Sequence, residues 1–147
     1  DAIERLGNDS ELVLTLEYNL AEQLHLKGRF DEAHALAEGT LERKTIAFGP
    51  DHYLTLLTMD NLAVALAGLG RYDEAITLHN AARAGLIDQM GPDHPFTLIV
   101  ERHRISTMLV AGYRQVTPDT VNDLVRRHEE ALGPDHPDTD KARSLLN

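Results

Sequence analysis

Three Asp-His pairs recur along the chain at a constant interval and are the first candidates for chemistry. The pairs begin at Asp51, Asp93 and Asp135, each follows a Gly-Pro dipeptide, and neighbouring pairs stand 42 residues apart. A carboxylate beside an imidazole could bind a metal ion or orient a general base. The constant interval, however, is the signature of a tandem repeat, and the fold of the repeat decides whether the pairs can meet.

The repeated unit extends well beyond this block. Segment 28–33, Gly-Arg-Phe-Asp-Glu-Ala, matches segment 70–75, Gly-Arg-Tyr-Asp-Glu-Ala, and the tripeptide Asn-Leu-Ala occurs at both 19–21 and 61–63. The sequence therefore predicts a single array for residues 1–147. Its units run over residues 7–48, 49–90 and 91–132, followed by a C-terminal capping helix over about 137–146.

Each unit reads as two helices. Apolar residues in segment 53–69 recur every three or four positions, which is typical of an amphipathic helix and not of a strand. Gly70 ends this helix, because glycine tolerates the left-handed conformation of a helix C-terminus. A second helix follows over about 73–90, and small side chains at Ala63 and Ala75 allow the two helices to approach closely.

This arrangement argues against a shared metal site. Helices pack about 8–10 Å apart, so equivalent histidines on consecutive hairpins should lie well over ~10 Å from one another. One zinc ion binds its ligands at about 2 Å, so these histidines cannot share it. We expect each aspartate to cap the following helix while its histidine packs across the turn, with no cofactor and no catalytic residue.

The units resemble the 42-residue kinesin-light-chain type of tetratricopeptide repeat (TPR). The resemblance rests on Asn-Leu-Ala, on Gly-Arg-Tyr-Asp-Glu-Ala and on the closing Gly-Pro-Asp-His-Pro, and it covers nearly the whole chain. It implies an all-α fold, a right-handed α-solenoid of antiparallel helix hairpins. It also implies a protein-interaction module, often the sensor of a bacterial multidomain regulator.

The third unit departs from the pattern at segment 112–119, where the usual turn is replaced. Thr117 followed by Pro118 is a good N-cap and first-turn pair, so the next helix is predicted over 118–132. Whether this irregularity is a worn repeat or a distinct surface stays open. His79 and His128 fall on the inward stripes of second helices, and we interpret both as packed core residues.

The resemblance also places a concave groove along the first helices of the units. We call the equivalent position in each repeat a slot. The groove-facing slots of each unit recur every three or four residues, so they lie on one face of its first helix. The groove-facing residues are expected to be Thr15, Tyr18, Asn19, Glu22 and His25 in the first unit, Leu57, Asp60, Asn61 and Val64 in the second, and Ile99, Arg102, His103 and Ser106 in the third.

Asn19 and Asn61 are the main candidates for peptide contact. A carboxamide offers a donor and an acceptor, so it can pair with a peptide backbone; the alternative is a bond within the scaffold. Arg102 could hold a partner's carboxylate or pair with an acid of the array such as Glu101 or Asp60. Glu22 and Asp60 at one end, with Arg102 and Arg104 near the other, would orient a peptide by charge.

Charge and composition limit the partners. With 24 acidic against 14 basic residues the formal net charge is −10, which disfavours nucleic acid and anionic membrane surfaces. The excess acid is either a solvated outer face or an acidic docking groove. The chain has no cysteine and no long apolar run, so we expect a cytoplasmic protein with no membrane span. Segment 2–7 resembles the tail of a preceding second helix, which predicts a fragment of a longer chain.

Three classes of function follow from this. The first is a module that binds a protein or peptide segment in the groove, either from a partner or from another domain of the parent chain. The second is a structural spacer or self-association scaffold without a groove ligand. The third is an enzyme, which no constellation of residues supports, so the prediction is a binding module that is not an enzyme.

Overall fold

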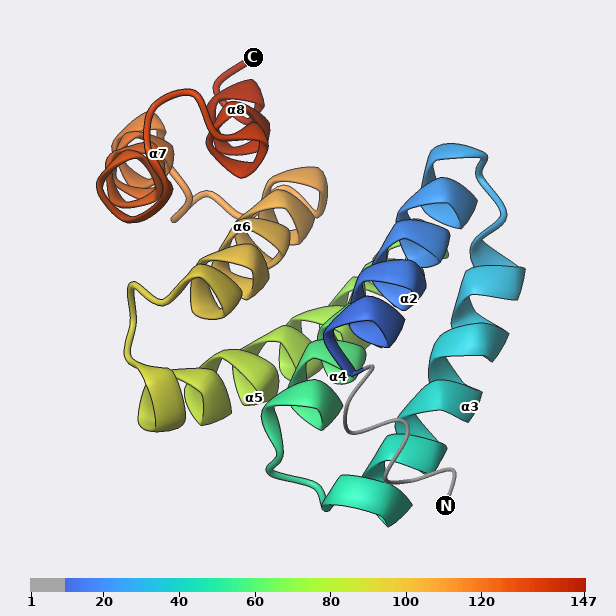
Figure 1. Cartoon of the computed structure of the whole chain (residues 1–147). Helices are drawn as coiled ribbons and strands as arrows, with labels where there is room; N and C mark the ends of the chain where they lie inside the picture. The colour runs from blue at the N-terminus through green and yellow to red at the C-terminus, as the bar shows by residue number, and fades with distance from the viewer. Residues whose placement is uncertain (1–9) are drawn as a thin grey trace.

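The computed structural model describes residues 10–147, and for residues 10–15 and Tyr18 it describes the backbone alone. Within this range the chain forms seven α-helices and no strand (Figure 1). The helices are α2 (Ser10–Leu26), α3 (Phe30–Phe48), α4 (Tyr53–Gly68), α5 (Tyr72–Met90), α6 (Pro95–Val110), α7 (Pro118–Leu132) and α8 (Pro137–Ser144).

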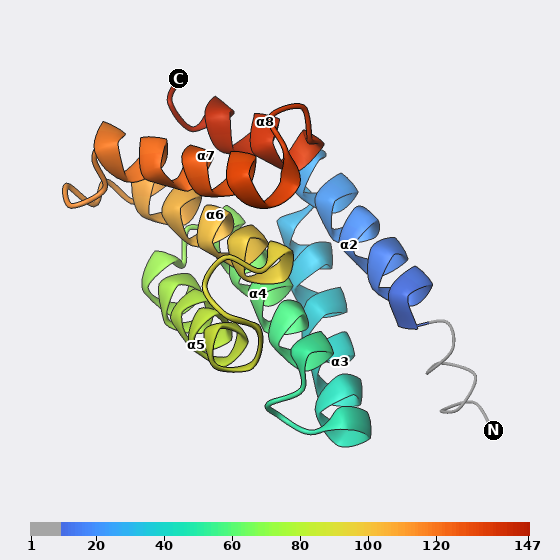
Figure 2. The ribbon, with the colours of Figure 1, turned by 60° about the vertical axis from the view of Figure 1, so that its left-hand side comes forward.

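Consecutive helices pair as antiparallel hairpins, and the hairpins stack on one another (Figures 1 and 2). Helix α4 packs against α3 of the preceding hairpin as well as against its own partner α5, and α5 packs against α6 in turn. Each hairpin therefore buries its apolar side on its neighbours, as in a solenoid. The predicted all-α, right-handed solenoid is confirmed. The unit boundaries stay a prediction, because helix ends do not define where a repeat begins.

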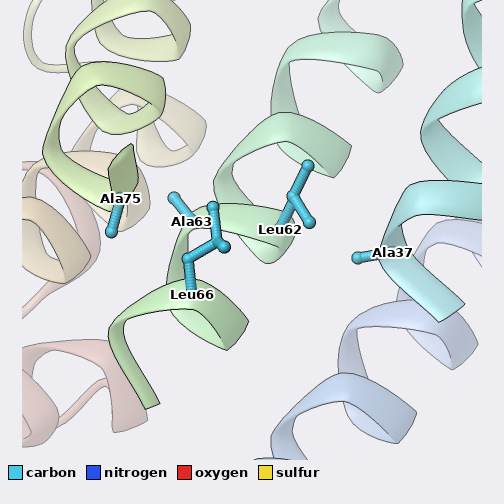
Figure 3. Close-up of a cluster of buried hydrophobic side chains, with 5 residues drawn as sticks. All are labelled: Ala37, Leu62, Ala63, Leu66 and Ala75. Atoms are coloured by element: carbon cyan, nitrogen blue, oxygen red, sulfur yellow. The ribbon is translucent and has the colours of Figure 1, made fainter. Parts of the chain in front are cut away.

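Small side chains bring the helices of neighbouring hairpins close together. Figure 3 shows Leu62, Ala63 and Leu66 of α4 between Ala37 of α3 and Ala75 of α5, and all five are buried. A buried alanine keeps two helix backbones near the lower end of the usual 8–10 Å range. The leucines of α4 fill the space on both sides, so this helix holds two hairpins together.

The Gly-Pro-Asp-His block forms the turn between hairpins. Gly91 has a φ of 91°, in the left-handed region that glycine adopts without strain, and its N–H donates to the carbonyl of Ile87 at 2.9 Å. The carbonyl of Gly91 accepts from the Thr97 hydroxyl at 2.9 Å, and Nδ1 of His94 accepts from the N–H of Phe96 at 3.1 Å. The block thus ends one helix and caps the next.

The same arrangement occurs at the other two blocks, where His52 and His136 accept from backbone N–H groups at 3.2 and 3.1 Å. The prediction that Asp51, Asp93 and Asp135 cap these helices is therefore wrong. The histidine stands at the N-cap position itself, from which its Nδ1 reaches the N–H two residues on. The aspartate stands one residue too early to replace it.

The irregular third unit folds as its sequence predicted. Helix α7 spans Pro118–Leu132, and the Thr117 hydroxyl accepts from the N–H of Thr120 at 3.4 Å. The Thr120 hydroxyl accepts in return from the N–H of Thr117 at 3.2 Å, which completes a capping box. The hydroxyl of Tyr113 lies 3.4 Å from the Asp73 carboxylate and ties the altered turn to the preceding hairpin.

The interpretation of segment 2–7 as the tail of a preceding helix lies outside the described residues. The expectation of a longer parent chain therefore stays a prediction.

Gly68 of α4 gives a test of the close packing between α4 and α3. A Cβ atom there would lie 2.2 Å from Cδ1 of Phe30, so the whole ring would have to move. We expect Gly68→Ala to lower the free energy of unfolding by about 1–3 kcal/mol, the usual cost of overpacking. Urea unfolding followed by circular dichroism measures this.

The matched control is Gly39→Ala in the middle of α3, where the new Cβ would lie 3.5 Å from Nη1 of Arg43, an ordinary contact. It should raise the stability by about 0.5–1 kcal/mol because alanine is the better helix former. Equal stability of the two variants would contradict the packing argument.

Candidate functional site

The first helices of the hairpins define the candidate site. Helix α2 packs against α4, and α4 packs against α6. Helix α8 reaches α2 through an ion pair between Lys141 and Glu22 at 2.9 Å. We call the surface formed by α2, α4, α6 and α8 the inner face, and the expected groove residues of the described chain belong to its helices.

Burial divides the thirteen expected residues into groups. The side chains of Thr15 and Tyr18 lie outside the described part of the structure. Exposed or half-buried side chains, which a partner could reach, belong to Asn19, Glu22, His25, Asn61, Val64, Ile99, His103 and Ser106. Leu57, Asp60 and Arg102 are buried, so the expectation that they contact a partner is corrected here: neighbouring helices already cover them.

Asp60 is the centre of a buried polar network. Its two carboxylate oxygens lie 2.7 Å from Nδ1 of His79 on α5 and 2.5 Å from Nδ1 of His103 on α6. Nε2 of His79 lies 3.0 Å from the hydroxyl of Thr107, also on α6. An ionised carboxylate only accepts hydrogen bonds, so each imidazole donates its Nδ1–H to Asp60. The network joins three helices of two hairpins.

The electrostatics of the network favour a charged Asp60 beside a neutral His103 ring. Burial raises the pKa of Asp60, but the two imidazoles, His103 foremost, outweigh burial and bring the pKa to about 2. Burial lowers the pKa of His103 below its ordinary value of 6.5, against the opposing effect of the Asp60 carboxylate. Asp60 is therefore a structural acceptor and not a free charge on the inner face.

The arginines of α6 also serve the scaffold. A guanidinium nitrogen of Arg102 lies 3.7 Å from the Asp138 carboxylate of α8. Arg104 donates to the side-chain oxygen of Asn80 at 2.7 Å and lies 3.4 Å from Glu101. The expectation that Asp60, Arg102 and Arg104 would orient a peptide by charge is not supported, because each already has a partner within the array.

The asparagines differ from these charged residues. Within the described part of the chain, the carboxamides of Asn19 and Asn61 form no hydrogen bond, and both side chains are at least partly exposed. Asn19 is on α2 and Asn61 on α4, one repeat apart on the same stripe of the inner face. Of the two alternatives left open by the sequence, no bond to the scaffold is formed among the described residues, and contact with a peptide stays a prediction.

Sequence reasoning missed Lys141 and Asp138 of α8. The signal was present, since one repeat beyond Ile99 the chain has Lys141, in the slot where the earlier units have Thr15 and Leu57. The prediction of segment 137–146 as a capping helix gives this unit no groove-facing positions. In the structure α8 contributes charged side chains to the inner face.

Among residues 10–147, no group of three histidine or acidic side chains is arranged to hold a metal ion. The same described range contains no helix long and apolar enough to cross a membrane.

The architecture and the inner face define a helical-repeat protein of the α-solenoid class. A family comparison matches residues 12–88, just over half of the chain, to the family described as Tetratricopeptide repeat. The chain belongs to the tetratricopeptide repeat family. This family consists of non-catalytic scaffolds, and its repeats are in general modules that bind proteins or peptides.

Solved structures agree with the fold. A crystal structure of nearly identical TPR-like repeats, from a Podosopora anserina protein described as a kinesin light chain, superposes with a TM-score of 0.75 over 90% of this chain at 21% identity. A variant of those repeats with glutamine replaced by methionine gives 0.74 over 99% at 20% identity. This chain covers 63% and 65% of those chains, less than two thirds of their length. No curated protein sequence gives a significant match.

Replacing the acceptor of the buried network tests its structural role. Asp60→Ala leaves the Nδ1–H groups of His79 and His103 without an acceptor, and a buried unsatisfied group costs about 1–3 kcal/mol. We expect a loss of stability of at least that size in urea unfolding. Asp88→Ala, an exposed aspartate on α5, is the control and should change stability by less than about 0.5 kcal/mol. A loss no larger for Asp60→Ala would rule out the network as a stabilising element.

His128 on α7 is a second buried imidazole. It is fully buried, its Nδ1–H donates to the carbonyl of Leu124 at 2.8 Å, and its Nε2 has no hydrogen-bond partner in the described structure. Burial lowers the pKa of His128 below 6.5, and the nearby Arg102 guanidinium lowers it further, while the Leu124 carbonyl opposes the shift. The ring is therefore neutral in the folded protein near pH 7, as expected for a core histidine.

This depressed pKa gives a pH dependence with a definite sign. The unfolded chain binds the proton more tightly than the folded one, so stability is lost as the pH falls below about 6.5. We expect His128→Phe to flatten the fall in melting temperature between pH 7 and pH 5. The control, Gln23→Phe, places the same ring at an exposed site of α2 and should keep the native slope. Equal slopes for all three proteins would show that His128 does not titrate on unfolding.

Proposed function

We propose that the chain is a protein-interaction module that holds an extended segment of a partner on its inner face. The observation that carries the proposal is the pair of asparagines, Asn19 and Asn61, whose carboxamides stand one repeat apart with no partner within the described structure. Such groups can donate to and accept from the backbone of a peptide without requiring a particular side chain.

Half-buried neighbours support this reading. Val64, Ile99 and Ser106 belong to the same face and offer small apolar and hydroxyl contacts. An extended peptide needs such a mixture, because polar groups fix its orientation while apolar ones supply the burial. We also propose that the protein is located in the cytoplasm, because its sequence contains no cysteine.

A structural or self-associating scaffold is the second candidate, and exposed leucines on α2 favour it. Leu16, Leu20 and Leu26 are 58%, 48% and 70% exposed. At the equivalent positions of the next unit, Thr58 is buried, Leu62 packs with Ala37 of α3, and Gly68 lies against Phe30 of α3. Stacking of a further hairpin or another molecule on α2 would bury them. Light scattering that shows a concentration-independent monomer would argue against self-association.

The resemblance of the units also leads us to propose that the module is the sensor part of a multidomain regulator, where it would read a partner or another domain of the same chain. A parent chain that contains no regulatory or catalytic domain would exclude this role.

The groove asparagines can be tested directly. We expect the double variant Asn19→Ala/Asn61→Ala to retain five- to a hundred-fold less of a specific partner, since each lost hydrogen bond costs about 0.5–1.5 kcal/mol. The measurement is a pull-down from lysate of the source cell with the immobilised array, quantified by mass spectrometry. Helicity and melting temperature should stay unchanged, because neither side chain bonds to the scaffold.

Asn122→Ala is the matched control, an exposed asparagine on the second helix α7. It should capture the same proteins as the native array. Identical lists from the native, double-variant and control proteins would favour the spacer over the binding module.

A further inference from the structure

The first and the last described helices meet across the inner face. Nζ of Lys141 on α8 lies 2.9 Å from Oε1 of Glu22 on α2, although 119 residues separate them in sequence. Figure 1 shows the ribbons of α8 and α2 apart, so the contact is made by the two long side chains. The two helices are the first and the last that the structure describes, so the ion pair connects the two most distant hairpins of the described part.

The repeat register shows that this pair is particular to the end units. The slot of Lys141 is filled in the earlier units by Thr15, Leu57 and Ile99, which are uncharged. The slot of Glu22 is filled in the second and third units by Val64 and Ser106, which are also uncharged. Among the units of the described chain, opposite charges therefore stand at these slots only on α2 and α8, whose side chains meet.

The pair is anchored in the core of the array. Lys141 also lies 3.9 Å from Asp138, one turn earlier on α8, and Asp138 lies 3.7 Å from the buried Arg102 of α6. Charges thus alternate from Arg102 through Asp138 and Lys141 to Glu22. This series of charges links α6 to α8 and α8 to α2.

We propose that the Lys141–Glu22 pair is a latch that holds α2 against α8 and keeps the array in a closed curvature. Both side chains are more than one third exposed, 37% for Lys141 and 35% for Glu22. An ion pair of this exposure changes an equilibrium by only about two- to five-fold. The latch is therefore a weak one, which opens and closes readily and responds to salt.

The latch has a consequence for binding that rests on the proposed function. A segment that enters the inner face between α2 and α8 has to break the Lys141–Glu22 ion pair, so an open array should admit it more easily. The latch itself does not depend on any ligand. A distance measurement on the free protein therefore tests it separately from partner capture.

The experiment measures the distance between α2 and the C-terminal hairpin by pulsed electron paramagnetic resonance. The chain has no cysteine, so Gln23→Cys on α2 and Asn122→Cys on α7, both exposed, can carry the two spin labels. In this labelled protein we expect Lys141→Glu or Glu22→Lys alone to lower the ratio of closed to open molecules at least two- to five-fold. The double exchange Glu22→Lys/Lys141→Glu should restore the native distribution.

A control pair, a neutral variant and a salt test accompany the experiment. The control is the exchange of Arg71 and Glu74, an exposed ion pair at the start of α5, which should leave the distances unchanged. The neutral variant Lys141→Gln removes the ion pair without reversing a charge. It should open the array in the same direction as Lys141→Glu, even if the charge reversal itself disturbs folding. About 1 M salt, where the Debye length is about 3 Å, should open the native protein as well. Distance distributions that are identical in the native, single-exchange and neutral proteins would overturn the latch.

Discussion

The turn between hairpins is the constraint on which the rest of this structure depends. Each one requires a glycine with positive φ to end a second helix, and a histidine whose Nδ1 caps the next first helix. A threonine hydroxyl returns to the glycine carbonyl and closes the turn. Because the three turns share this geometry, successive hairpins are related by a similar rotation, and their first helices line up on one face. The turns therefore determine that an inner face exists, whichever side chains the first helices carry on it.

The sequence predicted the fold well because the repeat supplies the information several times. The helix of residues 118–132 was predicted to its observed ends, since Thr117 and Pro118 form a strong local signal. The capping prediction failed on a finer point. Both Asp93 and His94 can cap a helix, and only the backbone geometry decides which of them stands at the N-cap. Sequence spacing cannot resolve a difference of one residue at a helix end.

The site was harder to predict because periodicity gives the direction of a side chain but does not show which side chains of other helices contact it. Asp60 occupies the same slot as Arg102 one repeat later, and periodicity alone predicts that both face the groove. In the structure His79 and His103 approach Asp60 from two other helices and bury it. Those partners are 19 and 43 residues away, so no local pattern connects them to Asp60. The buried group is stable there because its hydrogen bonds are satisfied.

The use of charges inside the array bears on what kind of partner it can recognise. Asp60, Arg102 and Arg104 are engaged with other helices, and Glu22 is engaged with α8. A partner would gain little from these charges unless it replaced an existing ion pair, and such an exchange is close to neutral in energy. Recognition by uncharged groups does not require an ion pair to be broken, because a partner displaces only water from them. Under the proposed function, the neutral side chains of the inner face would therefore form the binding contacts, because they can bond a peptide backbone. The net charge of −10 would act mainly on approach and solubility.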